Sequence, residues 1–230
     1  MFTGNEQRRK AATRERLLDA AEMLFAQKGY HGVPVREITR KAQCNQAAVN
    51  YHFRSKKNLY LEVFKSRWIP RSKRIQRSFW NSLERDPHPS PELVIRHVVK
   101  AFLYAPVLDE ALVRHYQLAA RELAQPGEAF DLVTQTIEPF LNALAGLLGR
   151  NQAQEDLGCV SMLGALSIFG QVLCFALAHN MVKRITGQEF NEGSTERLVD
   201  HITAFSVNGL QATLPGTTDG HRGGNSFSSA

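Results

Sequence analysis

The sequence predicts an all-α protein, with a three-helix helix-turn-helix domain at the N-terminus and a larger helical domain after it. Apolar residues recur at helical spacing along most of the chain, and no segment alternates apolar and polar residues for long enough to indicate a sheet. Residues 85–91 and other breaker-rich segments separate the helical stretches. Residues 1–77 contain 18 Lys and Arg against 6 Asp and Glu, which leaves 10 of the 28 basic and 16 of the 22 acidic residues for 78–230. Such a basic end on an acidic remainder is typical of nucleic-acid binding.

The first helix is predicted over residues 17–30. Its apolar residues fall at i, i+4, i+7 and i+8 and form one face that can pack beneath the two short helices that follow. They are Leu17, Ala21, Leu24 and Phe25. Lys28 and Gly29 are typical of a helix end, with a cation in the last turn and a glycine just past it. We expect residues 1–12 to form a mobile basic arm, in which Arg8, Arg9 and Lys10 reach phosphates or a minor groove.

Two short helical patterns around a polar turn follow within residues 33–57. The first begins near Pro34, which suits an opening helical turn, and its buried stripe consists of Val35, Ile38 and Ala42. The second covers residues 46–51, with Asn45 as a good N-cap. Two short helices joined by a tight turn, the second rich in polar side chains, indicate a helix-turn-helix whose second helix enters a major groove.

Three segments of this region carry a family resemblance: LLDAAEMLFAQKGY (17–30), VREI (35–38) and NYHFRSKKNLY (50–60). Within residues 13–59 the chain resembles the DNA-binding domain of TetR-family transcriptional regulators. The resemblance implies a DNA-binding domain at residues 1–57 and a double-stranded DNA operator as partner. The DNA contacts that it implies, position by position, are Val35, Arg36, Gln46, Ala47, Ala48, Asn50, Tyr51, His52 and Lys56.

The chemistry of these residues divides them into two groups. Gln46 and Asn50 are the best candidates for base edges, because an amide pairs bidentately with adenine. We expect the other polar contacts to hold phosphates and fix the register on DNA; they are Arg36, Tyr51, His52 and Lys56.

Three residues depart from the family pattern. Gln43 stands where the family has a glycine and must adopt a turn conformation that glycine takes more easily. Val33 replaces a capping threonine, and Asn50 replaces a common tyrosine. These departures leave open an alternative in which the chain keeps the fold but acts as a protein-interaction module.

Residues 58–214 are helical in pattern, and the resemblance implies that they form a ligand-binding and dimerisation domain. The expected helices cover about residues 56–83, 91–103, 109–123, 128–148, 155–184 and 194–214. Pro106 should end or kink the second of these, Pro139 should bend the fourth, and residues 149–154 should form a loop. The Gly/Ser-rich tail, residues 215–230, is expected to be disordered.

A run of basic residues follows the reading region. For most of them the favoured interpretation is a solvated helix face; they are Lys56, Lys57, Lys65, Arg67, Arg71, Lys73, Arg74 and Arg77.

Residues 157–182 contain no charged side chain and are long enough to span a bilayer. One interpretation is a membrane-anchored regulator. The favoured one is a helix buried half against its own domain and half against a second subunit, because polar and small residues are scattered through it. The resemblance implies a homodimer through helices at about 155–184 and 194–214. In the second helix the expected interface stripe is Leu198, Ile202, Phe205 and Gly209.

The resemblance also implies that the middle helices, residues 91–149, enclose a pocket for a small-molecule effector. Residues 115–140 resemble the CecR-like branch of the family, on the pair Arg121 and Glu122 followed by Pro126 and Pro139. An apolar lining with two polar contacts is expected from Phe102, Tyr116, Met162 and Phe169, with His115 and Gln171. The competing interpretation is that these residues are ordinary core, and that Arg121 and Glu122 form a structural ion pair.

Other classes of protein are disfavoured. Three widely separated cysteines fit neither a disulfide framework nor a metal site, and the histidines lack metal-ligand spacing. Nucleotide-binding, hydrolase and metalloprotease motifs are missing, so neither an enzyme nor a cofactor is expected. The charged N-terminus lacks a secretory signal, which favours the cytoplasm. The resemblance, together with these exclusions, implies a homodimeric repressor that binds a pseudo-palindromic operator and is released by a small molecule.

Overall fold

The computed structural model describes residues 4–108, 110–149, 157–187 and 191–212, and these are helical with no strand. The N-terminal helices are α1 (Gly4–Lys28), α2 (Val35–Lys41), α3 (Ala47–Phe53) and α4 (Lys56–Val63), followed by the π-helical turn η1 (Phe64–Trp68) and α5 (Ile69–Leu83). The rest are α6 (Pro91–Leu108), α7 (Glu110–Ala124), α8 (Phe130–Leu148), α9 (Leu157–Leu177), α10 (His179–Thr186) and α11 (Glu192–Ala212). The all-α prediction is confirmed.

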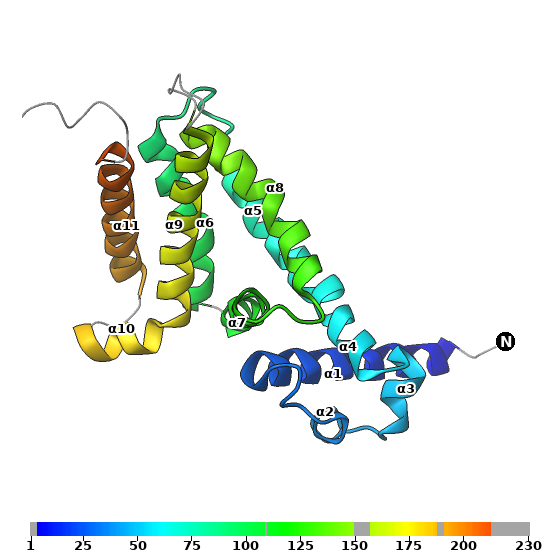
Figure 1. Cartoon of the computed structure of the whole chain (residues 1–230). Coiled ribbons are helices and arrows are strands. Elements are labelled where there is room, and N and C mark those ends of the chain that lie inside the picture. Colours follow the sequence, from blue (N-terminus) through cyan, green and yellow to red (C-terminus); the bar gives the residue numbers. More distant parts are fainter. Residues whose placement is uncertain (1–3, 109, 150–156, 188–190, 213–230) are drawn as a thin grey trace, which may run out of the picture.

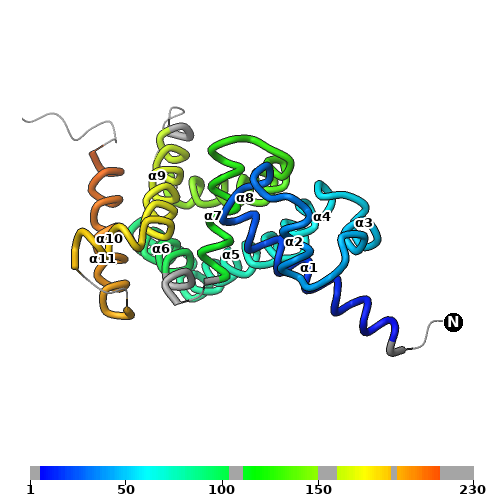
Figure 2. Tube along the Cα trace, turned by 90° about the horizontal axis from the view of Figure 1, so that it is seen from below, coloured from blue at the N-terminus to red at the C-terminus, as the bar shows by residue number. Residues whose placement is uncertain are grey.

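The helices form a head and a body at opposite ends of the molecule (Figures 1 and 2). Helices α1 to α4 make the head, in which α1 lies across α2 and α3. The body contains α6, α9 and α11, with α11 packed mainly on α6, and α5 and α8 run side by side from the body toward the head. Helix α7 lies between the two and contacts both α1 and α9.

The prediction of a mobile arm at residues 1–12 is wrong for the part that the structure describes. Helix α1 begins at Gly4, so Arg8, Arg9 and Lys10 are helical. No proline interrupts residues 4–16, and the charged side chains there favour a helix through pairs such as Glu6 and Lys10, one turn apart at 3.2 Å.

The long helix predicted for residues 56–83 is present, but it contains a π-helical turn. Ser55 caps it by accepting a hydrogen bond from the Asn58 amide (3.1 Å). The turn at Phe64–Trp68 places both of these rings inward, each at most 1% exposed. A π turn adds a residue to one helical turn, and such turns are frequent at functional sites.

Two helix ends differ from the prediction. Helix α6 continues through Pro106 to Leu108 rather than ending near residue 103. The single helix expected at 155–184 is two helices, because the chain turns at Ala178 between α9 and α10. Pro139 lies inside α8, as expected, whereas most of the predicted loop at 149–154 and the tail at 215–230 lie outside the described residues.

The apolar interior consists of two clusters. One cluster contains residues of the four head helices and of η1 together with residues of α7 and α8, among them Leu118 and Val133. The other fills the body between α5, α6, α8, α9 and α11. The first cluster therefore crosses from head to body, and the helix that starts at Lys56 crosses the predicted domain boundary at residue 57. That boundary stays a prediction.

Helix α9 is long and apolar enough to cross a membrane, over Val160–Leu177, and 28% of that window is buried within the protomer. It packs against α6, α7, α8 and α11, as a member of a helical core does. The unburied part forms an apolar face, on which Leu163 and Leu166 are 58% and 45% exposed.

Candidate nucleic-acid interface and interior cavity

The turn between α2 and α3 takes the form that the sequence predicts. Gln43 has φ 51°, in the left-handed region that favours glycine. The Asn45 side-chain oxygen accepts a hydrogen bond from the Ala47 amide (3.0 Å), so Asn45 caps one free amide at the start of α3. Cys44 packs against the core of the head, and burial raises the pKa of its thiol.

Helix α3 turns one face inward and the other outward. Val49 and Phe53 are 1% and 6% exposed and anchor the helix. On the other face, Gln46, Ala47, Asn50 and Tyr51 are exposed, with Tyr51 at 65%. This exposed face, with two amide side chains and one aromatic side chain, is available for contact with another molecule.

The N-terminal part of α1 lies next to this face. The Lys10 ammonium sits 5.8 Å from the centre of the Tyr51 ring. Hydrogen bonding to Tyr51, and then to Glu6, raises the pKa of Lys10. The sequence placed Lys10 in a mobile arm that reaches DNA, whereas the structure places it on a helix beside the exposed face of α3.

The remaining predicted contacts lie around α3. Arg36 is exposed on α2, while Val35 and Ala48 are half-buried and pack against the head core. The ring of His52 packs edge-on against Tyr51 (4.9 Å between centroids); burial and then the charges of Arg14 and Lys10 lower its pKa. The Lys56 ammonium lies 4.5 Å from the centre of the Tyr30 ring, and burial lowers its pKa.

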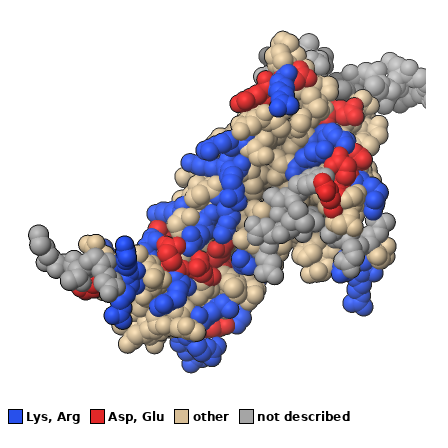
Figure 3. Space-filling view, turned by 180° about the vertical axis from the view of Figure 1, so that it is seen from behind, with Lys and Arg blue, Asp and Glu red and all other residues tan. Residues whose placement is uncertain are grey.

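The basic residues after α3 do not all form a solvated face. Arg67 binds Glu15 and Asp19 (2.6 and 2.9 Å), and Arg71 binds Glu22, so two of them join η1 and α5 to α1. Lys57 pairs with Glu128 at 2.5 Å. Figure 3 shows Lys and Arg side chains in a band along the back of the molecule, from the head to the body. The exposed members for which the solvated interpretation holds are Lys65, Lys73, Arg74 and Arg77.

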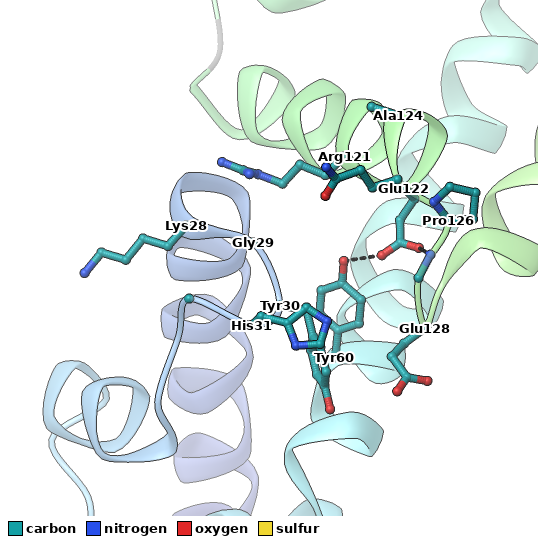
Figure 4. Close-up of a pocket in the computed structure, with 13 residues that line it drawn as sticks. Lys28, Gly29, Tyr30, His31, Tyr60, Arg121, Glu122, Ala124, Pro126 and Glu128 are labelled. Carbon is teal, nitrogen blue, oxygen red and sulfur yellow. Dashed lines mark hydrogen bonds between the residues drawn. The ribbon is translucent and has the colours of Figure 1, made fainter.

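A polar contact between α7 and the head lies at a groove of about 730 Å³ (Figure 4). The Tyr60 hydroxyl donates to a carboxylate oxygen of Glu122 at 2.5 Å. The other carboxylate oxygen accepts from the Gly127 and Ala129 amides (3.1 and 3.2 Å). Glu122 is 4% exposed, so a buried carboxylate ties α4 to α7 and to the start of α8.

Arg121 makes a second contact with the head. Its guanidinium donates to the carbonyls of Ala26 and Gln27 (2.9 and 2.6 Å), in the last turn of α1. A cation at a helix C-terminus satisfies free carbonyls and the helix dipole. The expectation that Arg121 and Glu122 pair with each other is therefore wrong: each binds a different element of the head.

Four of the six predicted effector-binding residues line one interior cavity: Phe102, His115, Tyr116 and Phe169. Met162 packs elsewhere in the body core, and Gln171 faces α11, where its amide donates to the Ser206 hydroxyl (3.2 Å). The sequence analysis did not assign the other eight lining residues to a pocket; they are Trp68, Ser72, Gln76, Ala119, Leu123, Ile137, Phe140 and Leu173. The volume is about 10 Å³, roughly enough for one water molecule, so the cavity is too small to hold an effector in this structure.

His115 is the most unusual group in this cavity. It is 3% exposed, its Nδ1 atom has no hydrogen-bond partner, and its ring stacks on Trp68 at 5.0 Å. Its backbone carbonyl accepts from the Trp68 indole (3.1 Å). Burial, and then the charges of Arg71 and Arg74, lower the pKa of His115 to about 3. The ring is therefore neutral near pH 7.

The stability of the protein should depend on pH through His115. In the unfolded chain its pKa is near 6.5, whereas in the folded protein it is about 3. The stabilisation is therefore fully present above pH 6.5 and is lost as the pH falls from 6.5 toward 3. We expect this contribution to fall by about 2 kcal/mol between pH 7.5 and pH 5. The measurement is urea unfolding of the wild type and His115→Phe at both values; an identical pH dependence in the two would contradict it.

A second hollow, of about 300 Å³, lies between α9 and α11. Gly164 lets the two helices approach, because a Cβ there would collide with Leu210. The rim is apolar and open: Leu163 and Phe205 are 58% and 63% exposed. Part of the predicted stripe on α11 faces inward instead, since Ile202 is fully buried and Leu198 packs on the body core, while Phe205 and Gly209 face out.

In the described residues, no group of three or more His, Cys, Asp or Glu side chains is placed to hold a metal ion.

Proteins similar in sequence to this chain are transcriptional regulators. The chain is 25% identical to the HTH-type transcriptional dual regulator CecR of Shigella flexneri over 203 residues, 83% of this chain and 87% of CecR. It is 25% identical to the HTH-type transcriptional repressor BepR of Brucella suis over 71% of this chain and 76% of BepR. A match to the probable regulator YttP of Bacillus subtilis is 42% identical but spans only 50 residues, 22% of this chain and 24% of YttP.

Two solved structures share the fold. Bacillus subtilis FadR in complex with stearoyl-CoA has a TM-score of 0.58 at 19% identity, over 85% of this chain and 98% of FadR. The hemolysin II regulator HlyIIR has a TM-score of 0.58 at 21% identity, over 85% and 97%. Two family profiles also match: "Bacterial regulatory proteins, tetR family" at residues 17–63, and the C-terminal domain of the HTH-type transcriptional dual regulator CecR at residues 91–210. The chain therefore belongs to the TetR family of transcriptional regulators, with a C-terminal domain of the CecR type.

Proposed function

We propose that this regulator is a cytoplasmic, homodimeric repressor that binds a pseudo-palindromic operator and is released by a small-molecule effector. The observation that carries the proposal is the outward face of α3, where Gln46, Asn50 and Tyr51 are exposed on a helix anchored by Val49 and Phe53. An exposed polar face on a rigid short helix is what major-groove reading requires. Two relatives support this class, since CecR is named a transcriptional dual regulator and BepR a transcriptional repressor.

The DNA contacts divide by chemistry. Gln46 and Asn50 read base edges, where an amide pairs with adenine. The phosphate contacts come from Arg36, Tyr51, His52 and Lys56, and the helical Lys10 joins them beside Tyr51. Val35, Ala47 and Ala48 are apolar and allow the backbone to approach the groove.

A second copy of the chain fits the open α9–α11 groove. An exposed apolar face with Leu163 and Phe205 at its rim is unfavourable in water and is covered when two copies meet. The groove lies at the opposite end of the molecule from α3 (Figure 1). A dimer through it would present two heads, with half-site centres roughly 34–36 Å apart or a multiple of that distance.

Helix α7 links the cavity to the head. His115 and Tyr116 line the cavity in its first half, while Arg121 and Glu122 bind α1 and α4 from its last turns. An effector that opens the cavity would move α7 and, with it, the head. The effector changes DNA affinity only by binding the two states differently. One structural relative was solved with stearoyl-CoA, which supports a small-molecule ligand for this fold.

Selection of bound duplexes from a random pool tests the function directly. We expect enrichment of a two-fold symmetric site whose half-sites are about one helical turn apart or a multiple of it. Recovery of unenriched sequences with binding that disappears in moderate salt would contradict the proposal, because phosphate attraction alone behaves in that way.

The dimer has its own test. Leu163→Glu combined with Phe205→Glu places charges in the apolar groove. We expect the dissociation constant of the dimer to rise at least about tenfold, because a buried unpaired charge is costly. Analytical ultracentrifugation measures the association. The matched control is Ser78→Glu with Asn81→Glu, two exposed positions on α5 outside the groove. Unchanged association in the groove variant would exclude this surface.

A further inference from the structure

The interior cavity has an aromatic wall. Trp68 stacks on His115 with the planes 11° apart, Tyr116 meets His115 edge-on (5.3 Å), and Phe102 packs with Phe140 and Phe169 (5.3 and 5.9 Å). Offset and edge-to-face packing of this kind accommodates another planar ring. The residues that line the cavity include no Asp, Glu, Lys or Arg, so a charged group inside it would have no counter-charge.

The polar atoms at the cavity are nearly all satisfied. The Gln76 amide donates to the Thr136 carbonyl (3.2 Å), with Ser72 3.5 Å away. The Tyr116 hydroxyl donates to the Phe102 carbonyl (2.6 Å). Among the described cavity residues, the buried side-chain atom that lacks a partner is Nδ1 of His115. Leaving such an atom unpaired is unfavourable, so a bound molecule that pairs with it recovers that cost.

We propose that the effector of this cavity is an uncharged aromatic compound with one hydrogen-bonding group, and that the Nδ1 atom of His115 selects it. This rests on the proposed effector response and names its ligand class. A carboxylate is disfavoured because the cavity has no cation among its lining residues: the nearby Arg71 already binds Glu22, and Arg74 is exposed. A neutral imidazole can accept from a phenol or donate to a carbonyl, depending on its tautomer.

Binding must enlarge the cavity, because about 10 Å³ does not hold a ring. Leu123 is 39% exposed, and Phe169 and Leu173 are half-buried, so the cavity wall is thin beside α7 and α9. Trp68 lines the cavity and belongs to the π-helical turn that follows α4 of the head. Opening the cavity therefore displaces groups on both elements that hold the head.

The test uses the full chain and three probes of one shape: 2-naphthol, naphthalene and 2-naphthoate. Isothermal titration measures their affinities. For the wild type we expect 2-naphthol to bind about fivefold to tenfold more tightly than naphthalene, as one net hydrogen bond gives, and 2-naphthoate to bind at least about tenfold more weakly than 2-naphthol. In His115→Phe, which keeps a ring and removes Nδ1, the preference for 2-naphthol over naphthalene should vanish.

His97→Phe is the matched control, because it makes the same substitution at a half-buried position of α6 that does not line the cavity, and it should keep the preference. If His115→Phe fails to fold, the ¹⁵N shift of His115 Nδ1 in the wild type decides: 2-naphthol should move it and naphthalene should not. No binding of any probe, tighter binding of 2-naphthoate, or a preference that survives His115→Phe overturns the inference. Binding of 2-naphthol without release of DNA supports the inference and contradicts the proposed effector response instead.

Discussion

Replacing Gln46 and Asn50 together with alanine is expected to weaken binding to the selected operator by about 100-fold or more. Each side chain is exposed on the outward face of α3, and a bidentate amide–base pair contributes about 1–3 kcal/mol of discrimination. Two such pairs give roughly this factor, because each 1.4 kcal/mol changes the dissociation constant about tenfold. A mobility-shift titration at fixed salt measures it, with the selected duplex beside a scrambled one.

The same variant should retain its non-specific affinity and its salt dependence, because the phosphate contacts are untouched. Alanine favours helices, so the helical content should not fall. A matched control is Gln27→Ala with Asn81→Ala, the same residue types at exposed positions away from α3. If the double variant keeps the site preference of the wild type, then Gln46 and Asn50 do not read bases, and the exposed Tyr51 becomes the first candidate.

The head was predictable because its determinants are local in sequence. The stripe on α1 ending at Lys28 and Gly29, the capping Asn45 and the strained Gln43 each act within a few residues. The structure confirms each of them. The helical arm was missed because charged residues such as Arg8 and Arg9 suit both a solvated helix and a mobile segment, and composition alone does not separate the two.

The junction and the cavity were less predictable because they depend on which helices meet. Arg121 and Glu122 are neighbours in sequence and suggested a pair with each other, yet on a helix adjacent side chains point about 100° apart. One therefore reaches α1 and the other α4. Trp68 and His115 are 47 positions apart, so nothing in the sequence shows that their rings stack.

The break between α9 and α10 was also missed, here for a local reason. Residues 157–182 contain no charge and show a continuous apolar pattern, so the sequence predicted one helix. The structure turns the chain at Ala178, where the carbonyl of Ala176 lies 3.2 Å from His179 Nδ1. A side chain that binds a nearby backbone carbonyl competes with the helical ladder, and this competition is invisible to a hydropathy pattern.

Replacing Glu122 with alanine is expected to lower the free energy of unfolding by about 3 kcal/mol. Three donors would lose their acceptor: the buried Tyr60 hydroxyl and the amides of Gly127 and Ala129. The buried Tyr60 and Ala129 donors each cost about 1–3 kcal/mol when unsatisfied, whereas Gly127 is exposed and its amide can bind water. The relief of no longer burying a carboxylate offsets part of the sum. Urea unfolding followed by circular dichroism measures the change.

Two further variants show whether the loss comes from this network. Tyr60→Phe removes one hydroxyl and leaves the amides bound, so it should cost about 1 kcal/mol. Glu84→Ala makes the same substitution at an exposed position and should change stability by less than about 0.5 kcal/mol. A loss below about 1 kcal/mol for Glu122→Ala would mean that water replaces the carboxylate. In that case Glu122 would not hold α7 to the head, and the coupling would run through the bonds of Arg121 to the last turn of α1 and through the apolar cluster that Leu118 shares with the head.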